Sequence, residues 1–225
     1  MDMRLVKNII KRFIFTFDFL MIRFFLPRLF DKVKQVHLSF DDVNFLCNGG
    51  SLLINRDFAS LIGSLNVPMD IFLMQENSNC TVHLDSIDNV KWNYHLPNLY
   101  DDYRIHPTTV YARFHYFRAS SNEVRTFYHY GGRVLLTCND NMRLSYDLTR
   151  DECNLVNKAH SFKKNGITYL KTDVRLEKML LPQLLKLRDN PFMVIFGHEW
   201  GGHMYNKRLK LIIQFLKSKN VHFIN

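Results

Sequence analysis

Short apolar runs alternate along this chain with segments of helical character, and this alternation limits the folds open to it. Runs typical of strands cover residues 36–40, 69–74, 111–117, 134–137, 192–196 and 221–224. Segments typical of helices cover residues 60–65, 122–130, 176–187 and 205–217, whereas residues 75–107 indicate irregular polar loops. Strands that alternate with helices favour a parallel sheet or an incomplete α/β barrel. At 225 residues, one domain with a substantial core is expected.

Two of the predicted strands end on ionisable residues. Asp41 and Asp42 directly follow residues 36–40, and His198 follows residues 192–196 after one glycine. The carboxyl ends of strands in α/β folds meet at one rim, where ligands bind. Adjacent strand residues point in different directions, so one aspartate could bind a metal while the other takes a proton from water. The pairing suggests metal-assisted hydrolysis, although an Asp-Asp dipeptide alone is also common in surface turns.

The segment from His198 to His203, His-Glu-Trp-Gly-Gly-His, is the most unusual stretch of the chain. A histidine at the end of an apolar run has the setting of a general acid, and Trp200 could wall a sugar-sized pocket. The zinc-protease motif HExxH is excluded, because these histidines are five residues apart and the two glycines break helices. The competing interpretation is that His198 is a core histidine at a strand end.

Two further segments carry candidate site residues. Arg113 and His115 are two residues apart, on one face of a predicted strand, where a guanidinium could hold a carboxylate and an imidazole could ligate a divalent ion. A partly buried structural histidine is the alternative. Asp173 follows another apolar run, but residues 172–177 could equally start a helix, capped by residue 172 or 173, with Arg175 and Glu177 in solvent.

Charge and cysteine content exclude some classes of function. Thirty Lys and Arg against 21 Asp and Glu give a net charge of +9, which favours anionic partners. The basic residues are scattered without a Lys/Arg run, so nucleic-acid binding is not expected. Four widely spaced cysteines without a CxxC pair favour reduced thiols in a cytoplasmic chain over a zinc ribbon or a disulfide framework.

Residues 1–30 form a basic, aromatic segment that we expect to be a helix preceding one domain over residues 31–225. Charged residues interrupt it at Lys11, Arg12, Asp18, Arg23 and Arg28. Its uncharged runs are therefore shorter than the roughly 20 apolar residues of a spanning helix. The segment lacks a clear cleavage site, so a signal peptide is not favoured. A helix packed on the domain, or partly disordered, competes with a helix lying on a membrane surface, which would be a peripheral membrane contact.

Several motifs occur in an order that resembles bacterial polysaccharide deacetylase-like proteins. They are Ser39-Phe40-Asp41-Asp42, Arg113-Phe114-His115-Tyr116-Phe117, residues 135–140, residues 171–177, and Phe196-Gly197-His198-Glu199-Trp200. The resemblance spans residues 36–200, and its two ends are its most specific parts. It implies an irregular or incomplete (β/α) barrel and a divalent metal, zinc by its ligand chemistry. It also implies the removal of N-acetyl or related acyl groups from a carbohydrate, in surface polysaccharide metabolism.

The resemblance also implies roles for individual residues. Asp41 would be the general base, Asp42 a metal ligand and His198 the acid for the leaving amine. Arg113 and Asp173 would form the supporting pair around the base. Contacts with substrate are expected from Trp200, Tyr116 and Glu199.

The sequence departs from the family pattern at the second metal-binding motif, which is shortened or degenerate here. Its best candidate is His95, in Trp92-Asn93-Tyr94-His95, with His83 and His106 as weaker options. The predicted metal ligands are therefore Asp42, His95 and His115. If the motif does not reach the metal, a catalytically inactive carbohydrate-binding or scaffold protein with the same fold is the alternative function.

Overall fold

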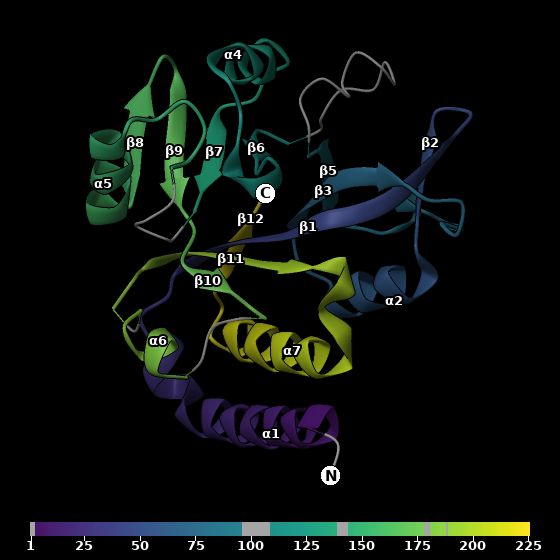
Figure 1. Ribbon diagram of the computed structural model, residues 1–225, viewed down its shortest axis with the longest axis vertical. Coiled ribbons are helices and arrows are strands. Elements are labelled where there is room, and N and C mark those ends of the chain that lie inside the picture. The colour runs from purple at the N-terminus through teal and green to yellow at the C-terminus, as the bar shows by residue number, and fades with distance from the viewer. Residues whose placement is uncertain (1–2, 96–108, 139–143, 178–180, 188) are drawn as a thin grey trace.

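The computed structural model describes residues 3–95, 109–138, 144–177, 181–187 and 189–225, and it shows a mixed α/β fold (Figure 1). The helices are α1 (Met3–Phe30), α2 (Arg56–Leu65), α4 (Ser121–His129), α5 (Arg150–Ala159), α6 (Leu181–Leu185) and α7 (Gly202–Ser218). Short 3₁₀ turns are η1 (Leu84–Ser86), η2 (His115–Phe117) and η3 (Glu199–Gly201). The strands are β1 (Gln35–Asn48), β2 (Ser51–Ile54), β3 (Met69–Glu76), β4 (Val82–His83), β5 (Val90–Tyr94), β6 (Tyr111–Ala112), β7 (Val134–Thr137), β8 (Ser161–Lys164), β9 (Ile167–Lys171), β10 (Val174–Arg175), β11 (Phe192–His198) and β12 (His222–Ile224).

The large sheet is built around β1, a strand of 14 residues. β11, β12 and β3 pair with β1 in parallel, and β10 and β5 extend the parallel arrangement beyond β11 and β3. β2 and β4 add an antiparallel extension after the turn that follows β1. Parallel strands that are covered by helices are buried on both faces, which explains the apolar runs of β1, β3 and β11.

The smaller sheet contains β6, β7 and β9 in parallel order, with β8 antiparallel to β9. Within the described residues the two sheets are separate and form no closed barrel. One side-chain hydrogen bond joins their edges, from Asn93 Nδ2 on β5 to the Tyr111 carbonyl oxygen on β6, at 2.9 Å. The predicted α/β class with parallel strands is therefore present.

The helices lie outside the sheets. Figure 1 shows α2 and α7 on one side of the large sheet, with α1 beneath α7, and α5 beside β8 and β9. α1 buries Ile22, Leu26, Leu29 and Phe30 in the main hydrophobic core. Within the part of the chain that the structure describes, no helix is long and apolar enough to cross a membrane.

Three segments differ from the sequence-based expectations. Residues 75–107 were expected to be loops, but β4 and β5 lie within them. β5 is a strand because it pairs with β3, which the local sequence does not indicate. The strand expected over residues 111–117 ends at residue 112, and residues 115–117 form the turn η2 instead. In place of the helix expected over residues 176–187, the described residues contain only α6.

Candidate metal centre and catalytic cavity

An irregularity in β1 sets the directions of the two adjacent aspartates. The pairing of β1 with β3 shifts register between Phe40 and Val43, and Asp42 adopts a left-handed backbone with φ of 54°. Aspartate is enriched in this conformation, and a bulge of this kind re-aims a side chain. Regular strand geometry would point Asp41 and Asp42 to opposite faces, whereas here both line one cavity.

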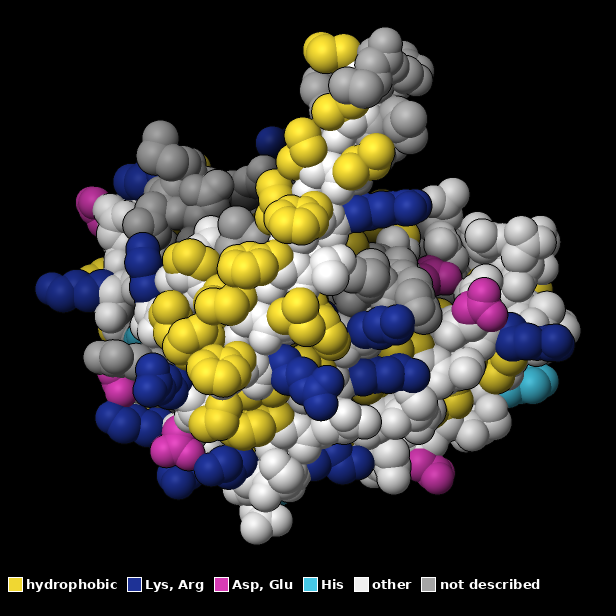
Figure 2. Space-filling model, turned by 90° about the horizontal axis from the view of Figure 1, so that it is seen from below, with side chains coloured by type: hydrophobic (Ala, Val, Ile, Leu, Met, Phe, Trp, Pro, Cys, Tyr) yellow, Lys and Arg dark blue, Asp and Glu magenta, His cyan; other side chains and the backbone are white. Residues whose placement is uncertain are grey.

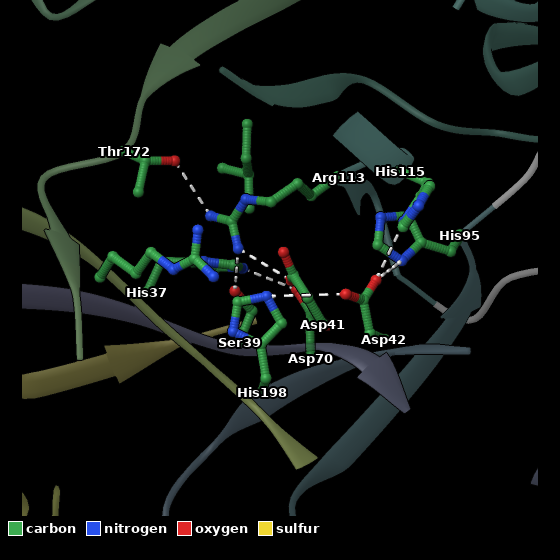
Figure 3. Close-up of polar contacts among 12 residues, drawn as sticks. His37, Ser39, Asp41, Asp42, Asp70, His95, Arg113, His115, Thr172 and His198 are labelled. Carbon is green, nitrogen blue, oxygen red and sulfur yellow. Dashed lines mark hydrogen bonds and ion pairs between the residues drawn. The ribbon is translucent and has the colours of Figure 1, made fainter. Parts of the chain in front are cut away.

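Asp41 is held by a buried arginine. Arg113 Nη1 donates hydrogen bonds to Asp41 Oδ1 at 2.9 Å and to Ser39 Oγ at 3.0 Å, and its Nη2 donates to Thr172 Oγ1 at 3.0 Å (Figure 3). The guanidinium also lies over the ring of Phe196, 4.1 Å from its centre. Because three hydrogen bonds hold the planar guanidinium of Arg113, it fixes the orientation of the Asp41 carboxylate.

Asp42 faces two imidazoles. Its Oδ1 atom lies 3.1 Å from His95 Nδ1 and 3.2 Å from His115 Nδ1, as Figure 3 shows. His95 follows β5 directly and is almost fully buried, whereas His115 opens the turn η2. The ligand atoms of the three residues lie within 4.8 Å of one another, so this group could hold a metal ion.

The chemistry of these donors fits a divalent cation. Both ring nitrogens of His95 are buried and have no hydrogen-bond partner among the described residues, even though one lies close to Asp42. A buried polar nitrogen without a partner is costly, and a metal would satisfy it. Ligand atoms bound at about 2.1 Å in a tetrahedral zinc site lie about 3.4 Å apart, which is close to the observed spacing.

The surroundings of Asp42 also shift the pKa of its carboxyl group. Burial acts to raise the pKa of Asp42, but contact with His95 and the charges of His95 and His198 outweigh it and lower this pKa to about 2. The ionised form that a metal ligand requires is therefore favoured.

The turn that carries His115 is strained. Tyr116 and Phe117 have φ values of 54° and 58°, which bulky side chains rarely adopt. Each such residue costs about 1–3 kcal/mol, and outliers of this kind cluster at functional sites. The strain turns the chain so that His115 faces Asp42, and it leaves Tyr116 63% exposed beside the cavity.

His198, the last residue of β11, lies opposite Asp41 in the register of the parallel pair. Glu177 Oε1 accepts a hydrogen bond from the His198 backbone nitrogen at 2.7 Å and lies 3.0 Å from His198 Nδ1. The other ring nitrogen, Nε2, therefore faces the cavity and lies 3.7 Å from Asp42 Oδ2. Trp200 stacks on the imidazole, with ring centres 4.5 Å apart.

The Glu177 carboxylate responds to the same contact. Burial acts to raise the pKa of Glu177, but its hydrogen bond with His198 and the histidine charge outweigh this effect and lower that pKa. A carboxylate that accepts the Nδ1 proton defines which nitrogen of His198 is free to act.

One cavity of about 240 Å³ unites most of the predicted residues. Of the ten site residues expected from the sequence, eight line it: Asp41, Asp42, His95, Arg113, His115, Tyr116, His198 and Trp200. Phe114, Phe117, Arg175 and Phe196 complete the lining. Of the weaker candidates, His83 is exposed on β4 and is not among the lining residues, and His106 lies outside the described residues.

Asp173 occupies a different position from the one expected. Its Oδ2 accepts a hydrogen bond from the Val194 backbone nitrogen at 2.9 Å, and its Oδ1 lies 3.7 Å from His160 Nδ1. Among the described residues, no hydrogen bond or ion pair joins Arg113 to Asp173. The preceding residue, Thr172, supplies the contact with Arg113.

Glu199 points away from the cavity lining. Its Oε2 accepts hydrogen bonds from the backbone nitrogen and the side-chain Nδ2 of Asn44, at 2.8 and 3.1 Å. This contact ties the end of β11 to β1 on the far side of the bulge. The expectation that Glu199 contacts substrate has no support in this position.

Four side chains of the site were not expected from the sequence: Ser39, Thr172, Arg175 and Glu177. Ser39 could have been found from its spacing of two residues from Asp41, which places both on one face of a regular strand. Glu177 was interpreted as solvated because residues 172–177 fit a helix start. In the structure β10 covers part of that segment and brings Glu177 against His198.

Comparisons with known proteins give little beyond this geometry. No protein-family model matches the chain, and no curated protein matches it. One solved structure from Bordetella bronchiseptica, a proposed polysaccharide deacetylase involved in O-antigen biosynthesis, is similar with a TM-score of 0.43 and 12% identity. The similarity covers 73% of this chain and 70% of that one. A TM-score at this level does not establish a common fold.

Proposed function

We propose that this protein is a metal-dependent hydrolase that removes N-acetyl or related acyl groups from a carbohydrate, in surface polysaccharide metabolism. One observation carries the proposal: the Asp42, His95 and His115 group lies in the same cavity as a second, arginine-held aspartate and a histidine with a carboxylate partner. Metal-assisted amide hydrolysis uses a bound metal ion together with a general base and a general acid.

Asp42, His95 and His115 would hold the ion, and one carboxylate with two imidazoles matches zinc. A bound zinc ion would polarise the acyl carbonyl and make water acidic enough to act as a nucleophile near neutral pH. The lowered pKa of Asp42 keeps this ligand ionised over the working pH range. Three protein ligands leave further coordination positions open, as in catalytic rather than structural zinc sites.

Asp41 would be the general base. Arg113 occupies one of its carboxylate oxygens at 2.9 Å, so the other oxygen remains for a water molecule in the cavity. Ser39 and Thr172 fix the guanidinium from two further sides. The base is therefore oriented before substrate arrives, which is where catalysis gains from preorganised groups.

His198 would be the general acid for the leaving amine. The contact of Nδ1 with Glu177 directs Nε2 into the cavity. Trp200 and Tyr116, 60% and 63% exposed, would flank the sugar at the cavity mouth, because aromatic faces pack against the apolar faces of sugar rings.

The fold proposed with this function is an interrupted (β/α) barrel of the polysaccharide deacetylase type. The parallel path β10-β11-β1-β3-β5 and the parallel path β6-β7-β9 would be two arcs of it, with breaks after β5 and after β9. Residues 31–225 would be one catalytic domain, with residues 1–30 as a separate segment packed against it.

Metal analysis paired with an amine-release assay tests the proposal. Purified protein reconstituted with Zn²⁺ should retain about one ion per chain and release amines from N-acetylated oligosaccharides. Asp42→Ala should lose the ion and the activity together. Asp41→Asn should keep the ion and lose about 10²- to 10⁴-fold in turnover.

The outcomes separate the enzyme from its alternative. Metal retention without amine release from any acetylated oligosaccharide, combined with saturable sugar binding, would indicate the inactive carbohydrate-binding protein. An Asp42→Ala variant that retains the wild-type amount of zinc would overturn the proposed ligand set. The variant Asp88→Ala, at an exposed carboxylate outside the cavity lining, serves as the matched control.

A further inference from the structure

Helix α1 is apolar on two opposite faces, and only one of them packs against the domain. Ile22, Leu26 and Leu29 face inward and are almost fully buried. The outer face of α1 consists of side chains that are 51–79% exposed: Ile9, Ile10, Phe13, Ile14, Phe17, Leu20 and Phe24. They recur at spacings of three and four residues and therefore form one stripe along the helix. Figure 2, which looks at α1 from below, shows this stripe as a continuous yellow band.

An exposed stripe of this size requires a covering partner. Single exposed apolar residues are normal, but contiguous apolar patches on one face mark interaction sites. α1 lies at the outer edge of the molecule, beneath α7, so none of the described elements covers its outer face (Figure 1).

The charges on α1 indicate the chemistry of the partner. The helix carries six Lys and Arg residues and a single acid, Asp18. Arg12, Arg23 and Arg28 are exposed beside the apolar stripe, and Figure 2 shows basic side chains along its border. Asp18 is buried and paired, with its Oδ2 atom 3.5 Å from Arg208 Nη1. The exposed charge described on this helix is therefore positive throughout.

The same buried acid fixes the orientation of the helix. Asp18 Oδ1 accepts a hydrogen bond from the backbone nitrogen of Leu181 at 3.0 Å, at the start of α6, while Arg208 belongs to α7. Burying a charge is costly unless it is paired, so this contact selects one rotation of α1 about its axis. The contact therefore keeps the outer face of α1 turned away from the domain.

We infer that the outer face of α1 is a docking surface for an anionic lipid bilayer. The apolar stripe would enter the boundary between headgroups and acyl chains, and the flanking arginines would contact anionic headgroups. Such a helix lies in the plane of the interface, which agrees with the absence of a membrane-spanning helix among the described residues. The inference is independent of the proposed hydrolase activity.

Vesicle co-sedimentation of the full chain tests this surface. The protein should bind vesicles of equimolar phosphatidylglycerol and phosphatidylcholine, and binding should weaken as salt concentration rises. The variant Phe13→Ser/Phe17→Ser/Phe24→Ser should lower the affinity by at least about tenfold, because these rings leave water on docking. Arg12→Glu/Arg23→Glu should lower it by at least about 25-fold, since each basic group near an anionic surface contributes about fivefold and the new carboxylates add repulsion.

Matched controls change the same chemistry elsewhere. Val110→Ser/Leu144→Ser/Leu155→Ser removes three exposed apolar side chains, and Lys158→Glu/Lys163→Glu gives the same change in net charge on α5 and β8. Both control variants should bind vesicles like the wild type. Thermal unfolding of every variant checks that the fold is retained, since all of the replaced side chains are exposed.

Three outcomes would overturn the inference. Equal binding to pure phosphatidylcholine vesicles, unaffected by the arginine changes, would exclude an anionic surface as the partner. Unchanged binding of the triple-serine variant would exclude the apolar stripe as the binding surface. A stable dimer in analytical ultracentrifugation that dissociates on the phenylalanine changes, without vesicle binding, would assign the outer face to a second copy of the chain.

Discussion

Two buried histidine–carboxylate pairs lie on neighbouring parallel strands of the large sheet, and they differ in their access to the cavity. His37 Nε2 on β1 lies 2.7 Å from Asp70 Oδ2 on β3, and both side chains are fully buried. His198 on β11 lies 3.0 Å from Glu177, which follows β10, and its second nitrogen faces the cavity. The contacts are chemically alike, so position along the strand separates a structural pair from a candidate catalytic pair.

The difference follows from sheet geometry. His37 is the third residue of β1, near its amino end, where its ring packs on Tyr111 with centres 4.3 Å apart. His198 is the last residue of β11, at the carboxyl ends of the parallel strands, where side chains leave the core and ligands bind. A proton donor must reach a substrate, and of these two pairs only the one at the carboxyl end of its strand lines the cavity.

Replacing His198 should have the largest effect. We expect His198→Ala to lower turnover on N-acetylated oligosaccharides by about 10²- to 10⁴-fold, because the leaving amine loses its acid. Zinc content should remain that of the wild type, since His198 is outside the proposed ligand set. Amine release, metal analysis and thermal unfolding on one preparation measure this. Wild-type turnover by the folded variant would show that His198 is a core histidine.

Replacing His37 should affect stability instead. We expect His37→Ala to lower the free energy of unfolding by about 3–5 kcal/mol, because Asp70 is left without its partner in a site closed to water. Turnover per folded molecule should be nearly unchanged. Denaturant unfolding measures the loss, and exposed His222→Ala, expected within about 0.5 kcal/mol, is the control. A large loss of turnover per folded His37→Ala molecule would abolish the distinction between the pairs.

Glu177 should show an intermediate effect as a positioning residue. We expect Glu177→Gln to reduce kcat by up to about a hundredfold through misalignment of His198, while KM and zinc content stay constant. Glu177→Asp should recover part of the loss. Steady-state kinetics on zinc-loaded protein provides the measurement. A change confined to KM would assign Glu177 to substrate binding rather than to the orientation of the imidazole.

The pH dependence of stability should show the smallest effect. The folded-state pKa of Glu177 is lowered from its ordinary value of 4.5, so its contribution is complete above that pH and is lost as the pH falls through the lower folded value. The difference in Tm between wild type and Glu177→Gln should therefore shrink on acidification below about 4.5. Thermal scans across this range measure it, and a constant difference would contradict the ionic contact.

Part of the site followed from local patterns. Carboxylates and a histidine directly after apolar runs predicted which residues meet at the strand ends, and Asp41, Asp42 and His198 indeed line one cavity. Asp173 fits the same local pattern, yet its carboxylate turns to the Val194 backbone. Local spacing identifies the rim of the sheet but does not specify which way each side chain turns there.

Other features depended on contacts that the sequence does not encode locally. β5 is polar enough to suggest a loop, and its pairing with β3 makes it a strand that ends beside His95. The segment around His115 suggested a continuous strand, whereas strained residues turn it toward Asp42. Such backbone outliers persist only where surrounding packing enforces them, so pattern and propensity do not reveal them.

The sequence by itself determined the alternation of strands and helices, the chemistry available at two strand ends, and an N-terminal segment that is rich in phenylalanine but too charged to span a membrane. These properties depend on composition and periodicity, which are local. The tertiary structure decided the bulge that re-aims Asp42, the meeting of His95 and His115 on its carboxylate, and the pairing of Glu177 with His198. Each of these requires strands distant in sequence to lie in one register, and register is set by packing of the whole sheet.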